Sequence, residues 1–285
     1  MPNQKAKLGV GRLPSILITG CSSGIGYHAA HTLQRLGWQV FATCRGDADA
    51  ARVSAEGLAS LRLDYSDGES IAAAVAAVLD MSGGRLDALF NNGAYAHPAA
   101  IEDLATTDLR ALFEANFIGW HDLTRRVIPL MRQQGAGRIV NCSSVVGFIA
   151  GRFNGAYAAS KFALEGWSDA LRLELAGSGI FVSLIEPGPI ATRFRDHARE
   201  HFLATLPAGS AFREDYEREA VRLTEDYPGS VFELGPGAVT SALLRALKSK
   251  RPSARYRVTL PAHAGAWAKR LLPTRILDWF VRRQT

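Results

Sequence analysis

Cysteine is scarce in this chain of 285 residues, and long hydrophobic runs are missing. The three cysteines, Cys21, Cys44 and Cys142, show neither a C-x-x-C spacing nor a paired pattern, which argues against a disulfide framework and a zinc knuckle. No uninterrupted apolar stretch is long enough to span a bilayer, and residues 1–14 lack the apolar segment of a signal peptide. We therefore expect a cytoplasmic protein in a reducing compartment.

Acidic residues are scarce near the C-terminus, although the whole chain has 27 of them against 33 basic residues. From Arg245 onward, eleven Lys and Arg residues accompany the single acid Asp278, so the formal net charge of +6 belongs to the tail. No nucleic-acid recognition motif accompanies this charge. We expect no nucleic-acid partner.

Apolar, β-prone segments alternate with helical patterns along the chain. The predicted strands are residues 15–19, 39–44, 58–64, 86–92, 137–143 and 180–187. Strands that are apolar on both faces and joined by helical crossovers, such as 68–81 and 108–133, indicate an α/β fold with a doubly wound parallel sheet of the Rossmann-like kind. With 47% hydrophobic residues, we expect a single domain over residues 15–260, after an N-terminal extension of residues 1–14.

The loop after the first predicted strand, "TGCSSGIG", is rich in glycine. Gly20, Gly24 and Gly26 permit a tight turn and close approach of the backbone to a pyrophosphate. The helix that is predicted from near Ile25 through Trp38 presents free N–H groups to the anion. This succession of strand, loop and helix predicts a dinucleotide-binding site, and a structural turn without a ligand is the alternative.

The second predicted strand ends in "VFATCR", which offers Cys44 and Arg45 but no acid. A site for NAD places an acid here on the ribose 2′-hydroxyl, whereas a basic residue accommodates the 2′-phosphate of NADP. We therefore predict NADP as the cofactor, with Arg45 on the 2′-phosphate and the hydroxyls of Ser22 and Ser23 assisting. The alternative is that Arg45 is a solvated surface side chain.

Tyr157 and Lys161 are four residues apart in a segment with a helical pattern. Residues at this spacing project from the same face of a helix. An ammonium beside a phenol favours the phenolate, so we expect Lys161 to lower the pKa of Tyr157 and to make it a proton donor near neutral pH. An ordinary amphipathic helix is the alternative for this pair taken alone.

Seven motifs then occur in the order and at the spacings of one known family. They are "TGCSSGIG", Asp64, "NNGA" at 91–94, Asn116, Ser144, "YAASK" at 157–161 and "PGPIAT" at 187–192. The chain resembles the short-chain dehydrogenase/reductase family over residues 15 to about 192. The order Asn-Asn-Gly-Ala departs from the usual Asn-Asn-Ala-Gly of that family.

The resemblance implies a role for each motif. Tyr157 would be the general acid or base, and Lys161 would lower its pKa and bind the nicotinamide ribose. Ser144 would donate to the substrate oxygen, and Asn116 would hold a water that links Lys161 to solvent. The expected cofactor contacts are Gly20, Ser22, Ser23, Gly24, Ile25, Gly26, Arg45, Asp64, Tyr65, Asn91, Gly93, Tyr157, Lys161, Pro187, Gly188, Ile190 and Thr192.

These expectations amount to an NADP(H)-dependent oxidoreductase that interconverts a lipophilic aldehyde or ketone and an alcohol. A non-catalytic nucleotide-sensing or membrane-docked binding protein on the same fold is the alternative. The related enzymes are often dimers or tetramers, so we expect a homo-oligomer. The stretch "HAREH" at 197–201 matches a zinc-peptidase signature, but no third ligand stands out and we expect no metal.

Two segments outside the core motifs are expected to set specificity and contacts. Residues 193–237 are predicted to form amphipathic helices, a substrate lid over an apolar pocket. Candidate wall residues, which are alternatively core residues, are Phe194, Phe202, Leu203, Leu206, Phe212, Tyr216, Phe153, Asn154, Tyr95, His97, Pro189 and Ile190. Residues 261–285 are amphipathic and basic, which fits a helix packed on protein, the interpretation we favour, or a helix making peripheral contact with an anionic membrane.

Overall fold

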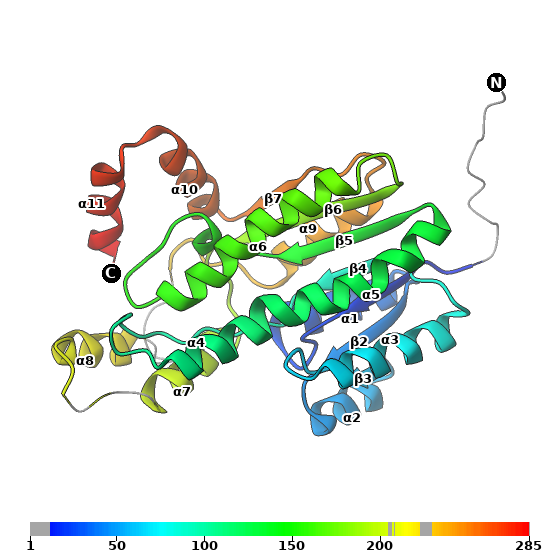
Figure 1. Ribbon diagram of the computed structural model, residues 1–285, viewed down its shortest axis with the longest axis horizontal. Helices are drawn as coiled ribbons and strands as arrows, with labels where there is room; N and C mark the ends of the chain where they lie inside the picture. Colours follow the sequence, from blue (N-terminus) through cyan, green and yellow to red (C-terminus); the bar gives the residue numbers. More distant parts are fainter. Residues whose placement is uncertain (1–11, 205–206, 208, 223–229, 285) are drawn as a thin grey trace.

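Seven parallel strands form a single sheet at the centre of the computed structural model, which describes residues 12–204, 207, 209–222 and 230–284 (Figure 1). The strands are β1 (Ser15–Ile18), β2 (Gln39–Cys44), β3 (Ala59–Arg62), β4 (Ala88–Asn91), β5 (Gly137–Cys142), β6 (Ile180–Pro187) and β7 (Arg255–Val258). Their order is β3-β2-β1-β4-β5-β6-β7. This confirms the predicted doubly wound parallel sheet in one domain.

The central strands are buried on both faces, as their apolar sequences require. β1 pairs with β2 through Ile16 and Val40 and with β4 through Ile16 and Ala88. Successive connections run outward in opposite directions from β1 and β4, so the strand order reverses between them. Ligands of such sheets bind at this reversal, outside the carboxyl ends of the strands.

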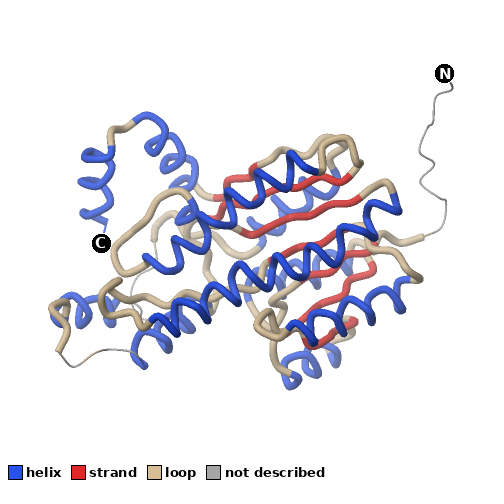
Figure 2. The backbone as a smooth tube through the Cα atoms, in the orientation of Figure 1, coloured by secondary structure: helices blue, strands red, loops and turns tan. Residues whose placement is uncertain are grey.

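Helices cover both faces of the sheet (Figures 1 and 2). Behind the sheet, α1 (Gly24–Arg35) packs on α9 (Gly237–Lys248). In front of the sheet lie α3 (Gly68–Ser82), α5 (Gly119–Gln134) and α6 (Gly155–Glu174). α2 (Asp47–Ala55) follows β2. The first helix ends three residues before the predicted Trp38, because Gly37 takes a left-handed conformation with φ of 81°.

The long helical pattern at 108–133 forms two helices joined by a π-helical segment. α4 (Thr106–Phe113) continues through η1 (Glu114–Ile118) into α5 without leaving helical geometry. A π segment inside a helix often marks a functional site. Here it contains Asn116, one of the predicted site residues.

β7 is an edge strand that the sequence analysis did not predict. Its sequence, "RYRV", alternates polar and apolar residues, and Arg255 pairs with Leu184 of β6. A strand with only one neighbour does not need to be apolar on both faces. The search for continuous apolar runs therefore missed it.

The predicted lid and tail are helical and extend from one end of the sheet (Figure 2). α7 (Phe194–Ala204) and α8 (Arg213–Arg222) follow β6, while α10 (Leu260–Leu271) and α11 (Thr274–Gln284) follow β7; the short η2 (Val145–Gly147) follows β5. The predicted wall residue Leu206 and most of the predicted N-terminal extension lie outside the described residues. Across the part of the chain that is described, no helix has both the length and the apolar character needed to cross a membrane.

Candidate active site

A cavity of about 710 Å³ opens at the carboxyl ends of the strands, where the strand order reverses. The loops after β1, β2, β4, β5 and β6 line it together with α6 and α7. The predicted site residues found in its wall are Gly20, Ser22, Ser23, Gly24, Ile25, Arg45, Asp64, Tyr65, Gly93, Ser144, Tyr157, Lys161, Pro187, Gly188, Ile190 and Thr192. Segments that are far apart in the sequence thus line one cavity.

The glycine loop is shaped by contacts that no larger residue could make. Gly20 has a φ of 68°, and a Cβ there would lie 2.6 Å from the Cα of Gly93. A Cβ on Gly26 would lie 2.3 Å from the carbonyl oxygen of Gly20. Ser23, the N-cap of α1, makes no side-chain capping bond, so its hydroxyl and the first N–H groups of α1 remain available to an anion. The loop therefore fits a dinucleotide pyrophosphate.

Gly26 and Asn91 support the dinucleotide cradle, which is the glycine loop and the first turn of α1, and are not among the residues of the cavity wall, so their contact with a cofactor stays a prediction. Gly26 packs against Gly20. The Asn91 side chain is fully buried, and its amide nitrogen donates to Asn141 Oδ1 at 2.9 Å and to Thr124 Oγ1 at 3.1 Å. Asn91 is a structural residue because every polar group of its side chain is already engaged in the core.

Asn116 is also absent from the cavity wall and instead fixes a loop that borders it. Its Oδ1 accepts from the backbone N–H of Tyr95 at 3.0 Å, and its Nδ2 donates to the carbonyl of Tyr95 at 2.8 Å. The side chain therefore holds the chain after β4 in place. The role of Asn116 in a water relay stays a prediction.

Two further residues join the loops around the cavity and were not predicted. Asn92 lines the cavity, and its Nδ2 donates to the carbonyl of Thr19 at 3.0 Å. Trp120 donates from Nε1 to the carbonyl of Gly93 at 2.9 Å, and its ring lies under the ammonium of Lys161, 4.4 Å from Nζ. Trp120 follows Asn116 by four residues, and this helical spacing was the signal that could have revealed it.

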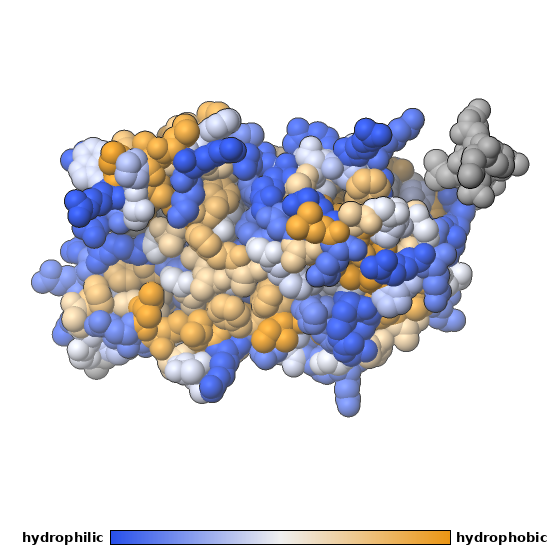
Figure 3. All heavy atoms as spheres, turned by 45° about the horizontal axis from the view of Figure 1, so that its top comes forward, coloured by the Kyte–Doolittle hydropathy of each residue, from blue (hydrophilic) through white to orange (hydrophobic). Residues whose placement is uncertain are grey.

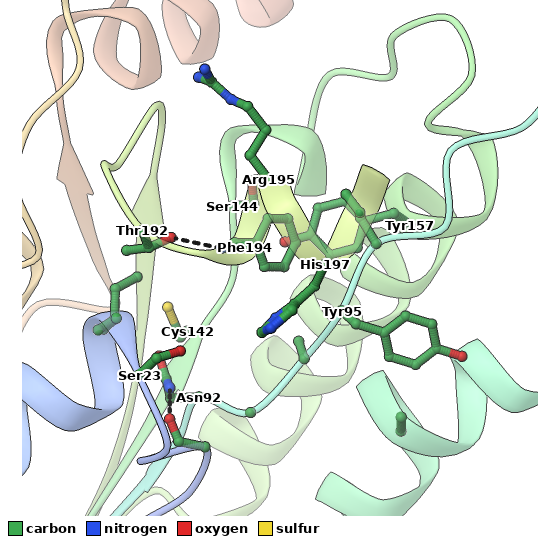
Figure 4. A pocket seen from close by; sticks show the side chains of 18 of the residues that line it. Ser23, Asn92, Tyr95, Cys142, Ser144, Tyr157, Thr192, Phe194, Arg195 and His197 are labelled. Carbon is green, nitrogen blue, oxygen red and sulfur yellow. Dashed lines mark hydrogen bonds between the residues drawn. The ribbon is translucent and has the colours of Figure 1, made fainter. Parts of the chain in front are cut away.

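Ser144 and Tyr157 lie on one side of the cavity (Figure 4), and Lys161 lines the same cavity. Tyr157 and Lys161 are one turn apart on α6, with Nζ 5.8 Å from the centre of the phenol ring. The Ser144 hydroxyl lies beside the Tyr157 side chain and accepts from the backbone N–H of Val146 at 3.3 Å, and the Lys161 ammonium donates to the carbonyl of Cys142 at 2.8 Å. A hydroxyl, a phenol and an ammonium are thus brought together as predicted.

The prediction that Lys161 lowers the pKa of Tyr157 is wrong for this arrangement. Burial is the largest cause acting on the phenol and raises its pKa, while the neighbouring Ser144 hydroxyl opposes this. Burial also lowers the pKa of Lys161 to about 8, against the fields of Cys142 and Glu165. Lys161 therefore loses part of its charge close to neutral pH, and its ammonium contacts a carbonyl and an indole ring rather than the phenol oxygen.

A buried ionic cluster lies behind these residues. Arg255 of β7 contacts Glu165 at 3.0 Å and Glu186 at 2.9 Å, and Arg257 contacts Glu186 at 3.0 Å. Burial raises the pKa of Glu186 to about 7, and the nearby Glu165 adds to this rise. The cluster joins α6, which carries Tyr157, to the strand that leads into the "PGPIAT" loop. Sequence reasoning missed it because β7 was not predicted.

The "PGPIAT" loop is held from two sides. A Cβ on Gly24 would lie 3.1 Å from Thr192, so the glycine loop and this loop are in contact. On the other side, the N–H of Gly188 donates to the carbonyl of Val258 at 3.0 Å, and a Cβ on Gly188 would lie 2.3 Å from Thr259 Oγ1. Thr259 has a φ of 91°, a strained value for a β-branched residue, and it is the N-cap of α10.

The lid is less apolar toward the cavity than predicted. Phe194 lines the wall, with its ring 5.4 Å from that of Tyr157, and His197 points into the cavity beside it (Figure 4). Of the other candidate wall residues, Tyr95, Asn154, Pro189 and Ile190 line the cavity. Phe202, Tyr216 and Phe212 instead form a separate small core with Phe153, His97 is buried, and Leu203 faces outward.

The two histidines of "HAREH", His197 and His201, line the cavity. His201 stacks on Tyr95, with ring centres 4.7 Å apart. Burial lowers the pKa of His201, and Arg45 adds to this effect. Among the residues that the structure describes, no group of three or more His, Cys, Asp and Glu side chains is arranged to hold a metal ion.

Known proteins share this arrangement of fold and site. A family model described as short chain dehydrogenase matches residues 14–202. The chain belongs to the short-chain dehydrogenase family. It is therefore an oxidoreductase of a family that uses a nicotinamide cofactor, and the cradle described above fits that group.

Two curated relatives cover most of this dehydrogenase. It is 42% identical over 266 residues to the uncharacterized oxidoreductase YbbO of Escherichia coli strain K12, covering 93% of this chain and 92% of that protein. It is 34% identical over 258 residues to retinol dehydrogenase 8 of Bos taurus, covering 85% and 80%. An alignment over 93% of the chain includes the lid.

Two solved structures resemble this dehydrogenase closely in fold. A short-chain dehydrogenase/reductase from Burkholderia phymatum, in complex with NAD, aligns with a TM-score of 0.74 and 26% identity over 91% of this chain and 92% of that chain. A single-residue variant of actinorhodin polyketide ketoreductase, with NADPH, aligns with a TM-score of 0.72 and 28% identity over 88% and 97%. Structural relatives thus include complexes with either dinucleotide.

Proposed function

We propose that this dehydrogenase interconverts a lipophilic aldehyde or ketone and the corresponding alcohol with NADP(H). The observation that carries the proposal is the meeting of Ser144, Tyr157 and Lys161 in the wall of one cavity that also contains a dinucleotide cradle. A protein that only senses a nucleotide has no need for a hydroxyl, a phenol and an ammonium in this arrangement. Catalysis is therefore favoured over the non-catalytic alternative.

Ser144, Tyr157 and Lys161 have different roles in carbonyl reduction. Ser144 donates a hydrogen bond to the carbonyl oxygen and stabilises the negative charge that develops there. Tyr157 holds the proton that this oxygen receives, and its raised pKa keeps the phenol protonated until the oxygen becomes basic. Lys161 lies one helical turn from Tyr157, with Nζ 5.8 Å from the centre of the phenol ring, and its role is to bind the nicotinamide ribose. The bound nicotinamide supplies the hydride in reduction and accepts it in oxidation.

Arg45 supports the choice of NADP. It stands in the cavity wall directly after β2, where the ribose that carries the 2′-phosphate would lie. The acid Asp49 lies in the same wall, and Arg52 engages it at 3.0 Å. Arg45 is thus the side chain suited to the phosphate, and the hydroxyls of Ser22 and Ser23 lie in the same wall.

The cavity wall supports a lipophilic substrate with a polar end. Tyr95 and Phe194 supply apolar surface near Tyr157, Pro189 and Ile190 add apolar surface to the same wall, and His197 adds a polar group. The relative retinol dehydrogenase 8 is named for a lipophilic alcohol. These features favour a long or cyclic carbonyl compound over a small ketone.

A homo-oligomer is part of the proposal. Ile118 of η1 and Phe162 of α6 are large apolar side chains, each at least 40% exposed, on the two helical elements that cover one face of the sheet. A second copy of the chain would cover them. Light scattering of the purified protein measures its mass, and a monomer would contradict this part.

The test of the main proposal is NADPH oxidation with a panel of long-chain aldehydes, ketosteroids, retinal and small ketones. We expect turnover with the lipophilic compounds. Tyr157→Phe should lower kcat by about 10²–10⁴-fold, because the proton donor is lost, while NADPH still binds. A mutant as active as the wild type would show that Tyr157 is not the acid, and no turnover with any of these carbonyls would contradict the proposal.

A further inference from the structure

The last two helices expose large apolar side chains on continuous faces. Trp267 and Leu271 of α10 lie one turn apart and are 61% and 69% exposed. Ile276, Trp279 and Phe280 share one face of α11, and each is 45–48% exposed. Leu277 is buried, but the rest of this apolar face is not covered by the described part of the chain. The sequence analysis favoured packing on this protein or on another subunit; the described part of the chain leaves this face uncovered, so whatever covers it comes from outside that part of the chain.

Cations surround the exposed apolar residues. Lys269, Arg270, Arg275, Arg282 and Arg283 lie on the two helices, against the single acid Asp278. The guanidinium of Arg283 lies 3.7 Å from the centre of the Trp279 ring. Figure 3 shows strongly hydrophobic and strongly hydrophilic residues side by side at this end of the molecule.

The composition of this exposed face distinguishes between two possible partners, a second copy of the chain and a membrane. The centre of a stable subunit interface is depleted in Lys but enriched in Arg, and a two-fold interface would place the cations of one copy against the same cations of the other, which is unfavourable. Helices that lie in the boundary layer of a membrane instead combine tryptophan and aliphatic residues with Lys and Arg, which are attracted to anionic lipid. The five cations on α10 and α11 therefore fit an anionic lipid surface better than a second copy of the chain.

The position of the two helices relates this surface to the active site. A Cβ on Gly265 of α10 would lie 2.9 Å from Ile149, so α10 packs on the loop that carries Ser144. Arg282 of α11 and Arg152 of the same loop border a hollow of about 410 Å³. A surface that receives α10 and α11 therefore lies next to this loop.

We propose that α10 and α11 dock this dehydrogenase on the surface of an anionic membrane. Trp267, Leu271, Ile276, Trp279 and Phe280 enter the headgroup boundary, and the surrounding Lys and Arg contact the anionic headgroups. The helices lie on the membrane and do not cross it, because each is only 11 or 12 residues long. This docking does not depend on the identity of the substrate or of the cofactor.

The first test is sedimentation of the full chain with lipid vesicles. We expect the protein to pellet with vesicles of phosphatidylcholine and phosphatidylserine, to stay in the supernatant with phosphatidylcholine alone, and to be released as salt is raised. Brominated lipid should quench tryptophan fluorescence in the wild type, and less so in Trp279→Phe. Equal recovery with and without anionic lipid, or no quenching, would overturn the proposal.

Matched variants distinguish binding through this surface from non-specific hydrophobic adsorption and from the effect of net charge. Trp279→Ser with Phe280→Ser should abolish pelleting, whereas Leu173→Ser, at a residue of α6 that is 67% exposed, should not. Arg282→Gln with Arg283→Gln should weaken binding about fivefold per charge, and Arg35→Gln with Arg110→Gln, which removes the same net charge elsewhere, should have little effect.

Three outcomes would count against membrane docking. If the control variants weaken binding as much as the test variants, the attraction is non-specific and the proposal fails. If Trp279→Ser with Phe280→Ser converts an oligomer into a monomer and the wild type does not bind vesicles, the face is a subunit interface. Because the quenching experiment uses the wild type, a variant that fails to fold leaves a decisive measurement in place.

Discussion

Gly26→Ala tests whether close packing behind the glycine loop shapes the cofactor site. Gly26 lies in the first turn of α1, and an added Cβ would be 2.3 Å from the carbonyl oxygen of Gly20 and 2.8 Å from Nδ2 of Asn92. Ordinary van der Waals contact begins at 3.4 Å, so the loop has to shift by about 1 Å. The opposing oxygen is a backbone atom, which cannot rotate away as a side chain does.

The size of the effect follows from two opposing contributions. Overpacking costs about 1–3 kcal/mol, and a contact with backbone belongs at the upper end. Alanine favours a helix over glycine by about 1 kcal/mol, so we expect the free energy of unfolding to fall by about 2 kcal/mol. For a chain of this length the unfolding entropy is about 0.6 kcal/mol per degree, which gives a Tm lower by about 3 °C.

The assay compares Gly26→Ala with Gly166→Ala by thermal unfolding and by NADPH binding. Gly166 is also helical, but an added Cβ there meets nothing within 4 Å. We expect Gly166→Ala to raise the stability by about 1 kcal/mol and to leave NADPH affinity unchanged. Gly26→Ala should weaken NADPH binding about tenfold or more, since a shift of this size breaks charge-assisted bonds to phosphate. A Gly26→Ala protein as stable and as tightly binding as the wild type would refute the reasoning.

Three further predictions concern single side chains. Arg45→Ala should raise the KM for NADPH by about tenfold or more and leave the KM for NADH nearly unchanged, and an equal change for both would remove the phosphate assignment. Because burial lowers the pKa of Lys161 from 10.5 to about 8, the unfolded chain binds more protons between these values. The wild type should therefore gain about 2–3 kcal/mol of stability relative to Lys161→Met from pH 8 to 10, measured by denaturant unfolding, and parallel curves would contradict this. Tyr216→Phe loses bonds to Asp103 at 2.5 Å and to the N–H of Ala100 at 2.9 Å, so hydrogen exchange in α8 should become faster while the central strands keep their protection; unchanged exchange would show that the lid is held by other contacts.

The sheet could be predicted because its central strands are apolar on both faces. Such a run, bounded by turns and helices, has few other ways to be buried, and the glycine pattern marks where the first helix begins. β7 could not be found in this way, because Arg255 and Arg257 place charge on an edge strand. Their partners are Glu165 and Glu186, which are far away in the sequence, so the pattern around Arg255 gives no local signal.

The site could be predicted as a set of residues but not as a set of orientations. The motif positions place Ser144, Tyr157 and Lys161 at the ends of β5 and on α6, and the structure brings them together. Whether Asn91 faces the cavity or the core depends on which strands flank it, and Asn141 supplies its partner. The pKa of Tyr157 depends on burial, which sequence spacing does not reveal. Spacing therefore predicts neighbours, and packing decides their chemistry.

The contact between Gly188 and Thr259 joins two parts of the protein that differ in function. Gly188 belongs to the "PGPIAT" loop, which lines the cavity, and Thr259 is immediately followed by α10. No flexible linker lies between them, and the strained backbone of Thr259 leaves little freedom to absorb a displacement. A tilt of α10 would therefore displace the loop that lines the cavity, so attachment of the last two helices to a surface would change the shape of the candidate active site.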